Sequence, residues 1–283
     1  MPVTDRHAGR HNAAVRAARL LQQKKHRSEQ RCFLIEGPSL IKSAINAGCS
    51  IEHLFVLEEA LPALGLESET GGHVKCPPHF KHVYVVDRRT LESLAQTKSP
   101  QGIVAVVEFI DRELSELGRL VPRQGNALVL VLPTLGDPGN AGTLMRSAEA
   151  FGVSAICFGP HAVEPYNDKV VRASMGSLFR VPLVRYHEWT ELAGALRDAD
   201  LRIAAADASG EDVRRVTLPQ RVALVVGQER HGLAGIPRSD LDAVIAVPQR
   251  SGVESLNAGV AGSLLLYECA RAQGLFTSPE RKE

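Results

Sequence analysis

The residues with the clearest chemical potential stand where apolar runs end and helix-like runs begin. Residues 247–257 lead from an apolar run into AGVAGSLLLYE, and they place Ser255 and Asn257 at the start of that helix-like run. A helix start exposes unpaired backbone N–H groups and the positive end of the helix dipole, which suit a polar ligand. Ser and Asn are also common helix caps. Taken alone, the segment is therefore typical of a cap, and a chemical role depends on its neighbours.

Two further segments have the same character. In residues 135–146, Asn140 stands at a helix start, and Arg146 follows about one and a half turns later. The arginine side chain is a rigid, charged fork that suits phosphate. In residues 222–233, an apolar run ends at Gly227, where the missing side chain lets a ligand approach the backbone. A tight turn explains Gly227 but not Glu229, two residues later.

These three segments follow apolar runs that alternate with helix-like runs. Strands are expected at 126–132, 154–159, 181–186, 201–207, 222–227 and 243–248, and helices at 141–152, 168–179 and 188–199. Continuous apolar runs alternating with helices predict an α/β fold with a parallel sheet covered on both faces. Ligands of such sheets bind at the carboxyl ends of the strands. We therefore expect the three segments to share one site.

The chain has 283 residues, a length that favours two domains. Upstream of the regular alternation, a smaller α/β domain is expected over residues 1–110. Its helices are predicted at 12–27, 39–48 and 89–96, its strands at 31–37, 53–59, 82–86 and 102–109, and residues 61–80 are expected to form a loop. Residues 111–125 are charged and end in Pro and Gly, so they are predicted to form a linker, and residues 126–283 the second domain.

Positive charge is concentrated at the beginning of the chain. The net charge is +1, but residues 1–31 hold eight lysines and arginines against two acidic residues. Such an arm suits a phosphate-bearing partner. A solvated helix face explains the same run equally well.

Composition excludes several classes of protein. The chain is 44% hydrophobic and 23% charged, as in ordinary globular proteins, and no apolar run is long enough to span a bilayer. No secretory signal is expected, although an amphipathic organelle-targeting segment stays open. Five scattered cysteines favour a reducing compartment, so we expect a cytoplasmic protein with no membrane partner.

Other chemistries lack their motifs. The chain has no G-x-G-x-x-G, no P-loop and no H-E-x-x-H, which disfavours a nucleotide-binding dehydrogenase. His73, Cys76, His79 and His82 are spaced three apart, but Pro77 and Pro78 interrupt any helix, and the spacing fits no common zinc motif. We expect no metal.

Together the three segments carry a family resemblance. GNAGTLMRSAEAFG, ALVVGQERHGL and VPQRSGVESLNAGVAGSLLLYE resemble, in this order, motifs one to three of the SpoU/TrmH RNA ribose 2′-O-methyltransferases of the SPOUT superfamily. DKVVRASMGSLFRVPL between the first two is also similar to the family. Upstream, ARLLQQKKHRSEQRCFLIEGPSLIKSAINAG and SPQGIVAVVEF resemble the substrate-binding domain that often precedes this unit.

The resemblance implies a fold, a cofactor and partners. It implies a C-terminal α/β domain with a trefoil knot that binds S-adenosylmethionine, a homodimer, and an N-terminal domain that binds RNA. Ribosomal RNA is favoured as acceptor, with tRNA and a self-resistance role left open. A non-catalytic RNA-binding or ribosome-assembly protein that keeps the fold is a further alternative.

The resemblance also assigns residues. Catalytic roles fall to Asn140, Arg146, Glu229, Ser255 and Asn257, and cofactor contacts to Gly227, Val247, Leu256 and Ala206. Arg146 is implied to handle the proton of the attacking ribose hydroxyl. Since an arginine side chain stays protonated in proteins, it can instead hold the adjacent phosphate and stabilise the developing alkoxide. RNA contacts are expected from the basic residues Arg19, Lys24, Lys25, Arg27 and Arg31.

Overall fold

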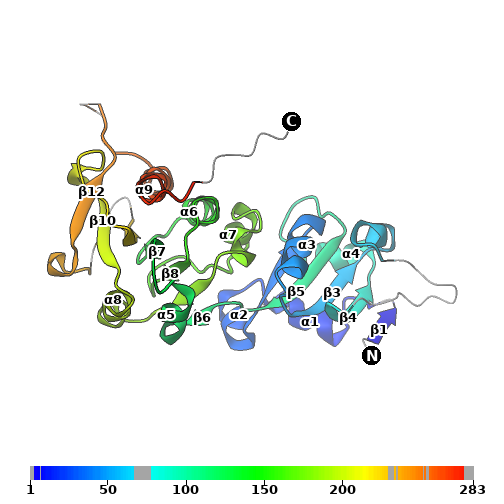
Figure 1. The fold of residues 1–283 in the computed structure, drawn as a ribbon. Helices are drawn as coiled ribbons and strands as arrows, with labels where there is room; N and C mark the ends of the chain where they lie inside the picture. Colours follow the sequence, from blue (N-terminus) through cyan, green and yellow to red (C-terminus); the bar gives the residue numbers. More distant parts are fainter. Residues whose placement is uncertain are drawn as a thin grey trace, which may run out of the picture. The chain divides into compact units, whose positions relative to one another are not determined.

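The computed structural model describes residues 3–6, 8–66, 78–228, 233, 235–250, 252 and 255–276. These residues form two compact units (Figure 1). The first unit comprises the described residues up to Ile110 together with Tyr166–Arg172. The second unit comprises Asp111–Pro165 and the described residues from Ala173 onward. Each unit has its own sheet.

The sheet of the first unit is mixed. Its strand order is β1-β4-β3-β5-β2, with β5 antiparallel to both of its neighbours and the other pairs parallel. The sequence predicted four of these strands and missed β1. Their bounds are β1 Val3–Arg6, β2 Cys32–Glu36, β3 Ile51–Val56, β4 Phe80–Val85 and β5 Ile103–Glu108.

The single helix predicted over residues 12–27 is wrong, because the chain forms two helices there. They are α1 (Ala13–Leu20) and α2 (Lys24–Gln30). The break has a physical cause in Arg27, which is only 4% exposed. Its Nη1 donates to the backbone carbonyls of Leu21 at 2.9 Å and Gln22 at 3.0 Å, which ties the second helix back onto the end of the first. The unit is completed by α3 (Pro38–Asn46), α4 (Arg88–Glu92) and the 3₁₀ helix η1 (Glu58–Leu64).

A short segment from the middle of the chain belongs to the first unit. Tyr166 is 1% exposed, and its ring stacks on Phe109 with 3.9 Å between centroids. It also lies 4.6 Å from the ring of Phe33. The Tyr166 hydroxyl accepts a hydrogen bond of 2.9 Å from the backbone N–H of Ile110. The sequence carries no periodic signal for this insertion.

The second unit contains a parallel sheet of seven strands, which confirms the predicted architecture. The strand order is β12-β10-β11-β7-β8-β9-β6, and every neighbouring pair is parallel. Three elements lie in the segment expected to be a linker: β6, the 3₁₀ helix η2 (Leu114–Glu116) and α5 (Leu117–Leu120). The strands are β6 Arg112–Glu113, β7 Ala127–Leu132, β8 Ala155–Phe158, β9 Leu183–Arg185, β10 Arg202–Asp212, β11 Arg221–Val226 and β12 Ala243–Ala246.

Helices cover both faces of this sheet (Figure 1). On one face, α5 and α8 (Trp189–Asp198) pack through Leu117, Leu192 and Leu196 onto the central strands. On the other face lie α6 (Pro138–Ala150) and α9 (Ala258–Ala272), which contact each other directly. Ser147 and Ser263 form a hydrogen bond of 2.7 Å between these two helices.

The helix predicted over residues 168–179 is wrong beyond its first turns. α7 covers only Asp168–Ala173, and a 3₁₀ turn follows at Ser177–Phe179. Between them, Met175 and Gly176 have positive φ angles of 50° and 89°, which no right-handed helix accommodates. Among the described residues, no helix is both long and apolar enough to cross a membrane.

Candidate active site at the carboxyl ends of the strands

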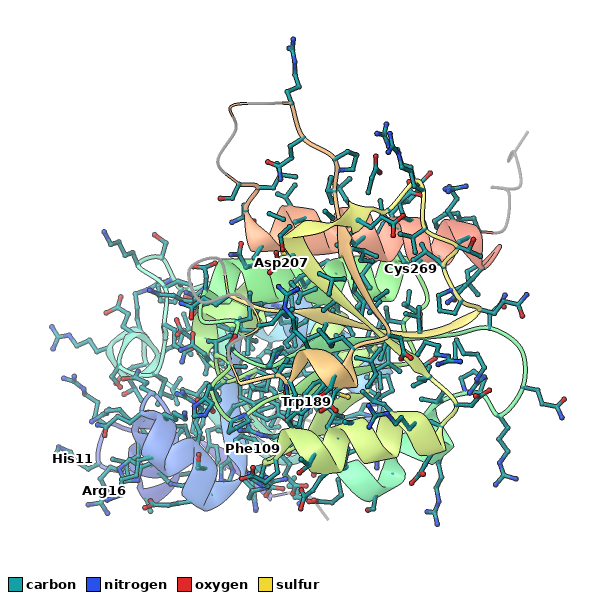
Figure 2. The ribbon with its side chains drawn as sticks, turned by 90° about the vertical axis from the view of Figure 1, so that its left-hand side faces the viewer. His11, Arg16, Phe109, Trp189, Asp207 and Cys269 are labelled. Atoms are coloured by element: carbon teal, nitrogen blue, oxygen red, sulfur yellow. The ribbon has the colours of Figure 1, made fainter. Side chains whose placement is uncertain are left out.

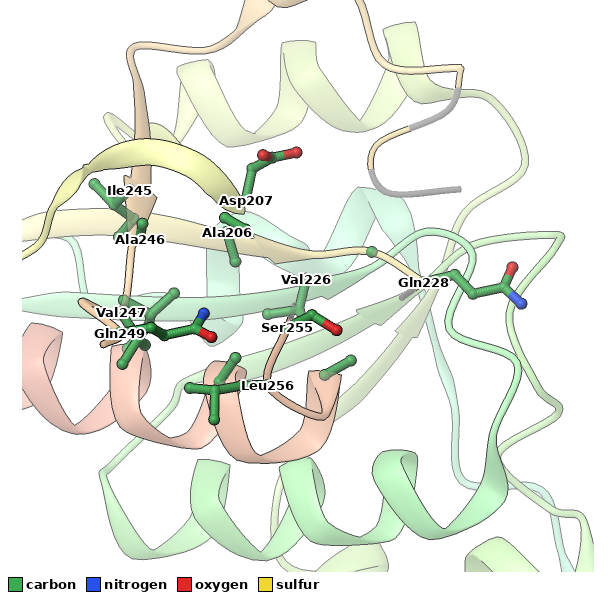
Figure 3. A pocket seen from close by; sticks show the side chains of 15 residues that line it. Ala206, Asp207, Val226, Gln228, Ile245, Ala246, Val247, Gln249, Ser255 and Leu256 are labelled. Carbon is green, nitrogen blue, oxygen red and sulfur yellow. The ribbon is translucent and has the colours of Figure 1, made fainter. Parts of the chain in front are cut away.

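A pocket of about 470 Å³ lies beside the ends of β11 and β12, the middle of β10 and the start of α9 (Figure 3). Its wall is formed by Ala206, Asp207 and Ala208 from the middle of β10, by the last residues of β11 and β12 with the residues that follow them, and by one side of α9. The lining residues are Ala206, Asp207, Ala208, Val226, Gly227, Gln228, Ile245, Ala246, Val247, Gln249, Ser255, Leu256, Ala258, Ala261 and Leu265. The pocket therefore occupies the edge of the sheet at which the sequence predicted a ligand.

The four residues predicted to contact a cofactor all line this pocket. Ala206 comes from β10, Gly227 follows β11, Val247 follows β12, and Leu256 precedes α9. Five of the lining residues are alanines and one is Gly227, so backbone groups are accessible to a ligand. Its volume falls in the range of small-molecule sites, which have mostly apolar walls and a few polar groups. The residues present thus fit a small-molecule cofactor.

Asp207 is a lining residue that the sequence analysis did not assign to the site. Its carboxylate accepts hydrogen bonds from the backbone N–H of Ser209 at 2.8 Å and from the Ser209 hydroxyl at 2.7 Å. These bonds hold the pKa of Asp207 below its ordinary value, so the side chain is an ionised acceptor at the edge of the pocket. The signal in the sequence was an acidic residue directly after the apolar run of β10.

The starts of α6 and α9 are capped by different residue types. Asp137 is the N-cap of α6 and accepts a hydrogen bond of 2.7 Å from the backbone N–H of Asn140. The Asn140 side chain is therefore not the cap. In α9, Asn257 is the N-cap, and its Oδ1 accepts from the backbone N–H of Val260 at 3.1 Å. Ser255 lies two residues before the cap and lines the pocket.

The two predicted asparagines converge on Gly259. A Cβ added to this glycine would lie 2.9 Å from Oδ1 of Asn140 and 3.1 Å from Oδ1 of Asn257. The preceding residue, Ala258, lines the pocket. A side chain at this position would have to displace the two amides, and the first and third sequence segments therefore meet beside the pocket.

Arg146 lies further along α6 with an exposed side chain. Within the described part of the chain, no carboxylate pairs with it. The nearby Glu149 is instead held by Arg180, whose Nη2 donates at 2.9 Å, and by the hydroxyl of Ser177 at 2.6 Å. The hydrogen bond from Arg180 lowers the pKa of Glu149. Arg146 thus keeps its charge available to an external anion.

Comparison with known proteins decides the family. A sequence model described as the SpoU rRNA Methylase family matches residues 127–267. The 23S rRNA (guanosine-2′-O-)-methyltransferase RlmB of Ralstonia nicotianae is 31% identical over 193 residues, which are 67% of this chain and 76% of the relative. The chain belongs to the SpoU methylase family.

Two further similarities extend over nearly the whole SpoU chain. The 23S rRNA (guanosine(2553)-2′-O)-methyltransferase RlmP of Bacillus subtilis (strain 168) is 28% identical over 258 residues, 90% of this chain and 95% of the relative. The AdoMet-bound rRNA methyltransferase of Sinorhizobium meliloti has a TM-score of 0.79 and 27% identity, and the alignment covers 97% and 99% of the two chains. A model described as the MRM3-like substrate binding domain matches residues 12–105.

The basic residues of this SpoU protein's first unit differ in exposure. Lys24 and Lys25 are exposed, and Figure 2 shows Arg16 of the neighbouring α1 pointing outward. Arg31 is also exposed, with its guanidinium 4.9 Å from the centroid of the Phe109 ring.

The other two predicted RNA contacts are less accessible. Arg19 is half-buried and donates to the hydroxyl of Ser93 at 3.0 Å. Arg27 is buried and holds backbone carbonyls between α1 and α2, so the prediction that it contacts RNA is corrected to a structural role.

A second pocket, of about 590 Å³, lies in the first unit beside the second half of α1 and strands β2, β3 and β5. Its lining includes five residues that can carry charge: Arg31, Cys32, Glu52, His53 and Glu108. Outside the wall, Lys81 bridges Glu52 and Glu108, with 3.0 Å to the latter. Burial, followed by the nearby Glu52, raises the pKa of the Cys32 thiol to about 11.

Some predicted residues lie outside the described part of the chain. These are Glu229 of the second segment and, from the spaced histidines and cysteine, His73 and Cys76. Among the residues that the structure does describe, no three His, Cys, Asp or Glu side chains are grouped so that they could hold a metal ion.

Proposed function

We propose that this chain transfers a methyl group from S-adenosylmethionine to a ribose 2′-hydroxyl in ribosomal RNA. The observation that carries the proposal is the meeting of Asn140 and Asn257 at Gly259, beside the strand-end pocket of a SpoU-family chain. The names of the relatives RlmP and RlmB support a guanosine of 23S ribosomal RNA as the acceptor.

The strand-end pocket would hold the cofactor. When bound, S-adenosylmethionine supplies an electrophilic methyl group. Backbone groups at Gly227, Val247 and Leu256 would bind its polar atoms, and the ionised Asp207 would accept hydrogen bonds from its hydroxyl or ammonium groups. The AdoMet-bound structure from Sinorhizobium meliloti supports S-adenosylmethionine as the cofactor, as does the AdoMet complex of AviRb from Streptomyces viridochromogenes, which has a TM-score of 0.78.

Arg146 would act on the acceptor RNA. Its protonated guanidinium does not accept a proton, so we assign it to binding the phosphate next to the acceptor ribose and to stabilising negative charge on the 2′-oxygen. Asn140, Ser255 and Asn257 would fix the two helix starts and orient the ribose. Positioning of this kind contributes several kcal/mol to such reactions.

Replacement of Arg146 by alanine tests the assignment. We expect Arg146→Ala to lower methyl transfer to an in vitro 23S ribosomal RNA transcript by about 100-fold or more, the usual effect of removing one charge-stabilising group. Because the side chain is exposed, melting temperature and cofactor affinity should stay unchanged. Arg202, exposed in the same unit and paired with Asp242 at 2.8 Å, provides the control Arg202→Ala. Near-normal transfer by the folded Arg146→Ala protein would contradict the proposal.

We further propose that the active form is a homodimer with a trefoil knot around the cofactor loop. Val260, Leu264 and Tyr267 share one face of α9 and are 46%, 43% and 41% exposed. An apolar helix face of this kind is unfavourable in water and suits a second copy of the chain. Light scattering in solution should therefore give twice the chain mass of 30.6 kDa.

A further inference from the structure

Met175 combines two unfavourable features at one position. Its φ angle of 50° lies in the left-handed region that favours glycine or asparagine. Its side chain is 65% exposed, more than any other large apolar side chain among the described residues. Ser174 and Ser177, which frame the turn, are buried. The fold thus holds an apolar side chain outward on a strained backbone, where a small polar residue would be more favourable.

The turn that carries Met175 is fastened to α6 on both sides. Before it, a Cβ added to Gly142 of α6 would lie only 2.9 Å from the backbone nitrogen of Ser174. After it, the hydroxyl of Ser177 donates to the Glu149 carboxylate at 2.6 Å. The position of the turn along α6 is therefore fixed by backbone packing at one end and by a charged hydrogen bond at the other.

Arg146 lies between these two contacts. Residues three and four apart share one face of a helix, so Gly142, Arg146 and Glu149 form one row along α6. The turn spans that row from its first member to its last. Met175, between Ser174 and Ser177, therefore belongs to a segment whose two ends contact Gly142 and Glu149, the residues on either side of Arg146 in this row.

We propose that Met175 positions the substrate: its side chain packs against the nucleobase of the acceptor nucleotide and holds the ribose beside Arg146. Proteins recognise unstacked RNA bases by packing side chains on their flat faces. The thioether is soft and polarisable and makes favourable contacts with aromatic rings. Backbone strain is commonly retained at functional positions. The inference rests on the proposed function, which places the acceptor at Arg146.

Replacing Met175 by glycine tests the role of the side chain without adding backbone strain. Met175→Gly removes the nucleobase contact and relieves the positive φ, so its melting temperature should equal or exceed that of the parent. With an in vitro 23S ribosomal RNA transcript as substrate, we expect its KM for RNA and its dissociation constant for RNA to rise about tenfold, the effect of losing one stacking contact. Affinity for S-adenosylmethionine should not change. Met175→Leu, which restores an apolar side chain, should recover most of the RNA affinity.

Three results would overturn the inference. One is unchanged RNA affinity and KM in Met175→Gly. A second is loss of RNA affinity that Met175→Leu does not recover. The third is dissociation of the Met175→Gly protein to single chains in light scattering, which would make Met175 a contact between two copies. If the parent protein transfers no methyl group, the proposed function fails, whereas the RNA affinities of the parent, Met175→Gly and Met175→Leu proteins still decide whether Met175 contacts RNA.

Discussion

The pockets of the two units are lined by different kinds of groups. In the strand-end pocket of the second unit, Asp207 is the one lining residue with an ionisable side chain in the described part of the chain. The pocket of the first unit is lined by Arg31, Cys32, Glu52, His53 and Glu108. The first wall offers mainly apolar side chains and backbone groups, while the second offers several side chains that can carry charge. We therefore expect close packing to matter more for the cofactor proposed to bind the second unit, and charge to matter more for the RNA proposed to bind the first.

The largest expected effect on stability concerns the close packing of α6 against Ala173 in the second unit. A Cβ on Gly142 would lie 2.3 Å from Cβ of Ala173 and 2.7 Å from its carbonyl carbon. Backbone atoms cannot move away as a flexible side chain would, so Gly142→Ala should destabilise the protein by about 1–3 kcal/mol. Urea unfolding monitored by circular dichroism measures this change, and cofactor affinity should fall with it.

Gly194 in α8 provides the matched control. It also lies inside a helix, but a Cβ there would meet nothing within 4 Å. Gly194→Ala should therefore stabilise the protein by roughly 0.5–1 kcal/mol, through the lower conformational entropy of the unfolded chain. Equal free energies of unfolding for the two variants would show that the close packing of Ala173 on Gly142 does not contribute to the stability of this unit.

A smaller effect is expected from charge in the first unit. Replacing the exposed Lys24 and Lys25 together by alanine should weaken RNA binding. It should also flatten its salt dependence, because each lost phosphate contact reduces the slope of log K against log salt by about 0.7–0.9. Filter binding at several salt concentrations provides both values. Lys42→Ala, which removes an exposed charge from α3, is the control.

Two outcomes of the lysine experiment would contradict the expectation that charge in the first unit matters for RNA and not for the cofactor. Unchanged RNA affinity in the double variant would remove α2 from the RNA-binding surface. A large fall in cofactor affinity would mean that charge in the first unit also governs the strand-end pocket.

The smallest expected effect is on the pH dependence of stability, through protonation of His53. Its Nδ1 is buried without a hydrogen-bond partner in the described part of the chain, and burial, then His82 and Lys81, lower its pKa from 6.5. The unfolded chain therefore binds this proton more tightly than the folded chain. The stability contributed by neutral His53 is complete above pH 6.5 and is lost as the pH falls toward the lowered folded pKa.

Melting temperature measured by fluorimetry as a function of pH tests this expectation. It should decrease below pH 6.5 in the parent protein, and His53→Phe should flatten the decrease. The aromatic neighbours Phe55 and Tyr84, with ring centroids 6.1 Å and 5.7 Å from His53, suit the replacement. An identical pH profile in the variant would assign the decrease to other groups.

The sequence predicted the parallel sheet and the edge at which the candidate site lies, for a simple reason. Continuous apolar runs identify buried parallel strands, and such strands end at one edge, so Ala206, Gly227 and Val247 had to lie near one another. The convergence of Asn140 and Asn257 on Gly259 was not predictable in this way, since it depends on how α6 packs against α9.

The features that the sequence did not predict all depend on contacts that the pattern of residues along the chain does not reveal. Helical periodicity continues through residues 21–23, and only the buried Arg27 guanidinium shows why the helix breaks there. Methionine has no preference for positive φ, so nothing in the sequence marked the turn at Met175. Asp207 followed an apolar run like many strand-ending residues, and its role depends on the bonds from Ser209.

The packing of Tyr166 on Phe109 has a consequence for exchanging modules between related chains. A substrate-binding module cut at residue 110 leaves behind the tyrosine that covers Phe33 and Phe109 and that accepts the hydrogen bond from Ile110. The transferable module is therefore discontinuous in sequence. A chimera that carries residues 166–172 with the foreign N-terminal part keeps this aromatic cluster intact, whereas one with a single junction exposes it to water.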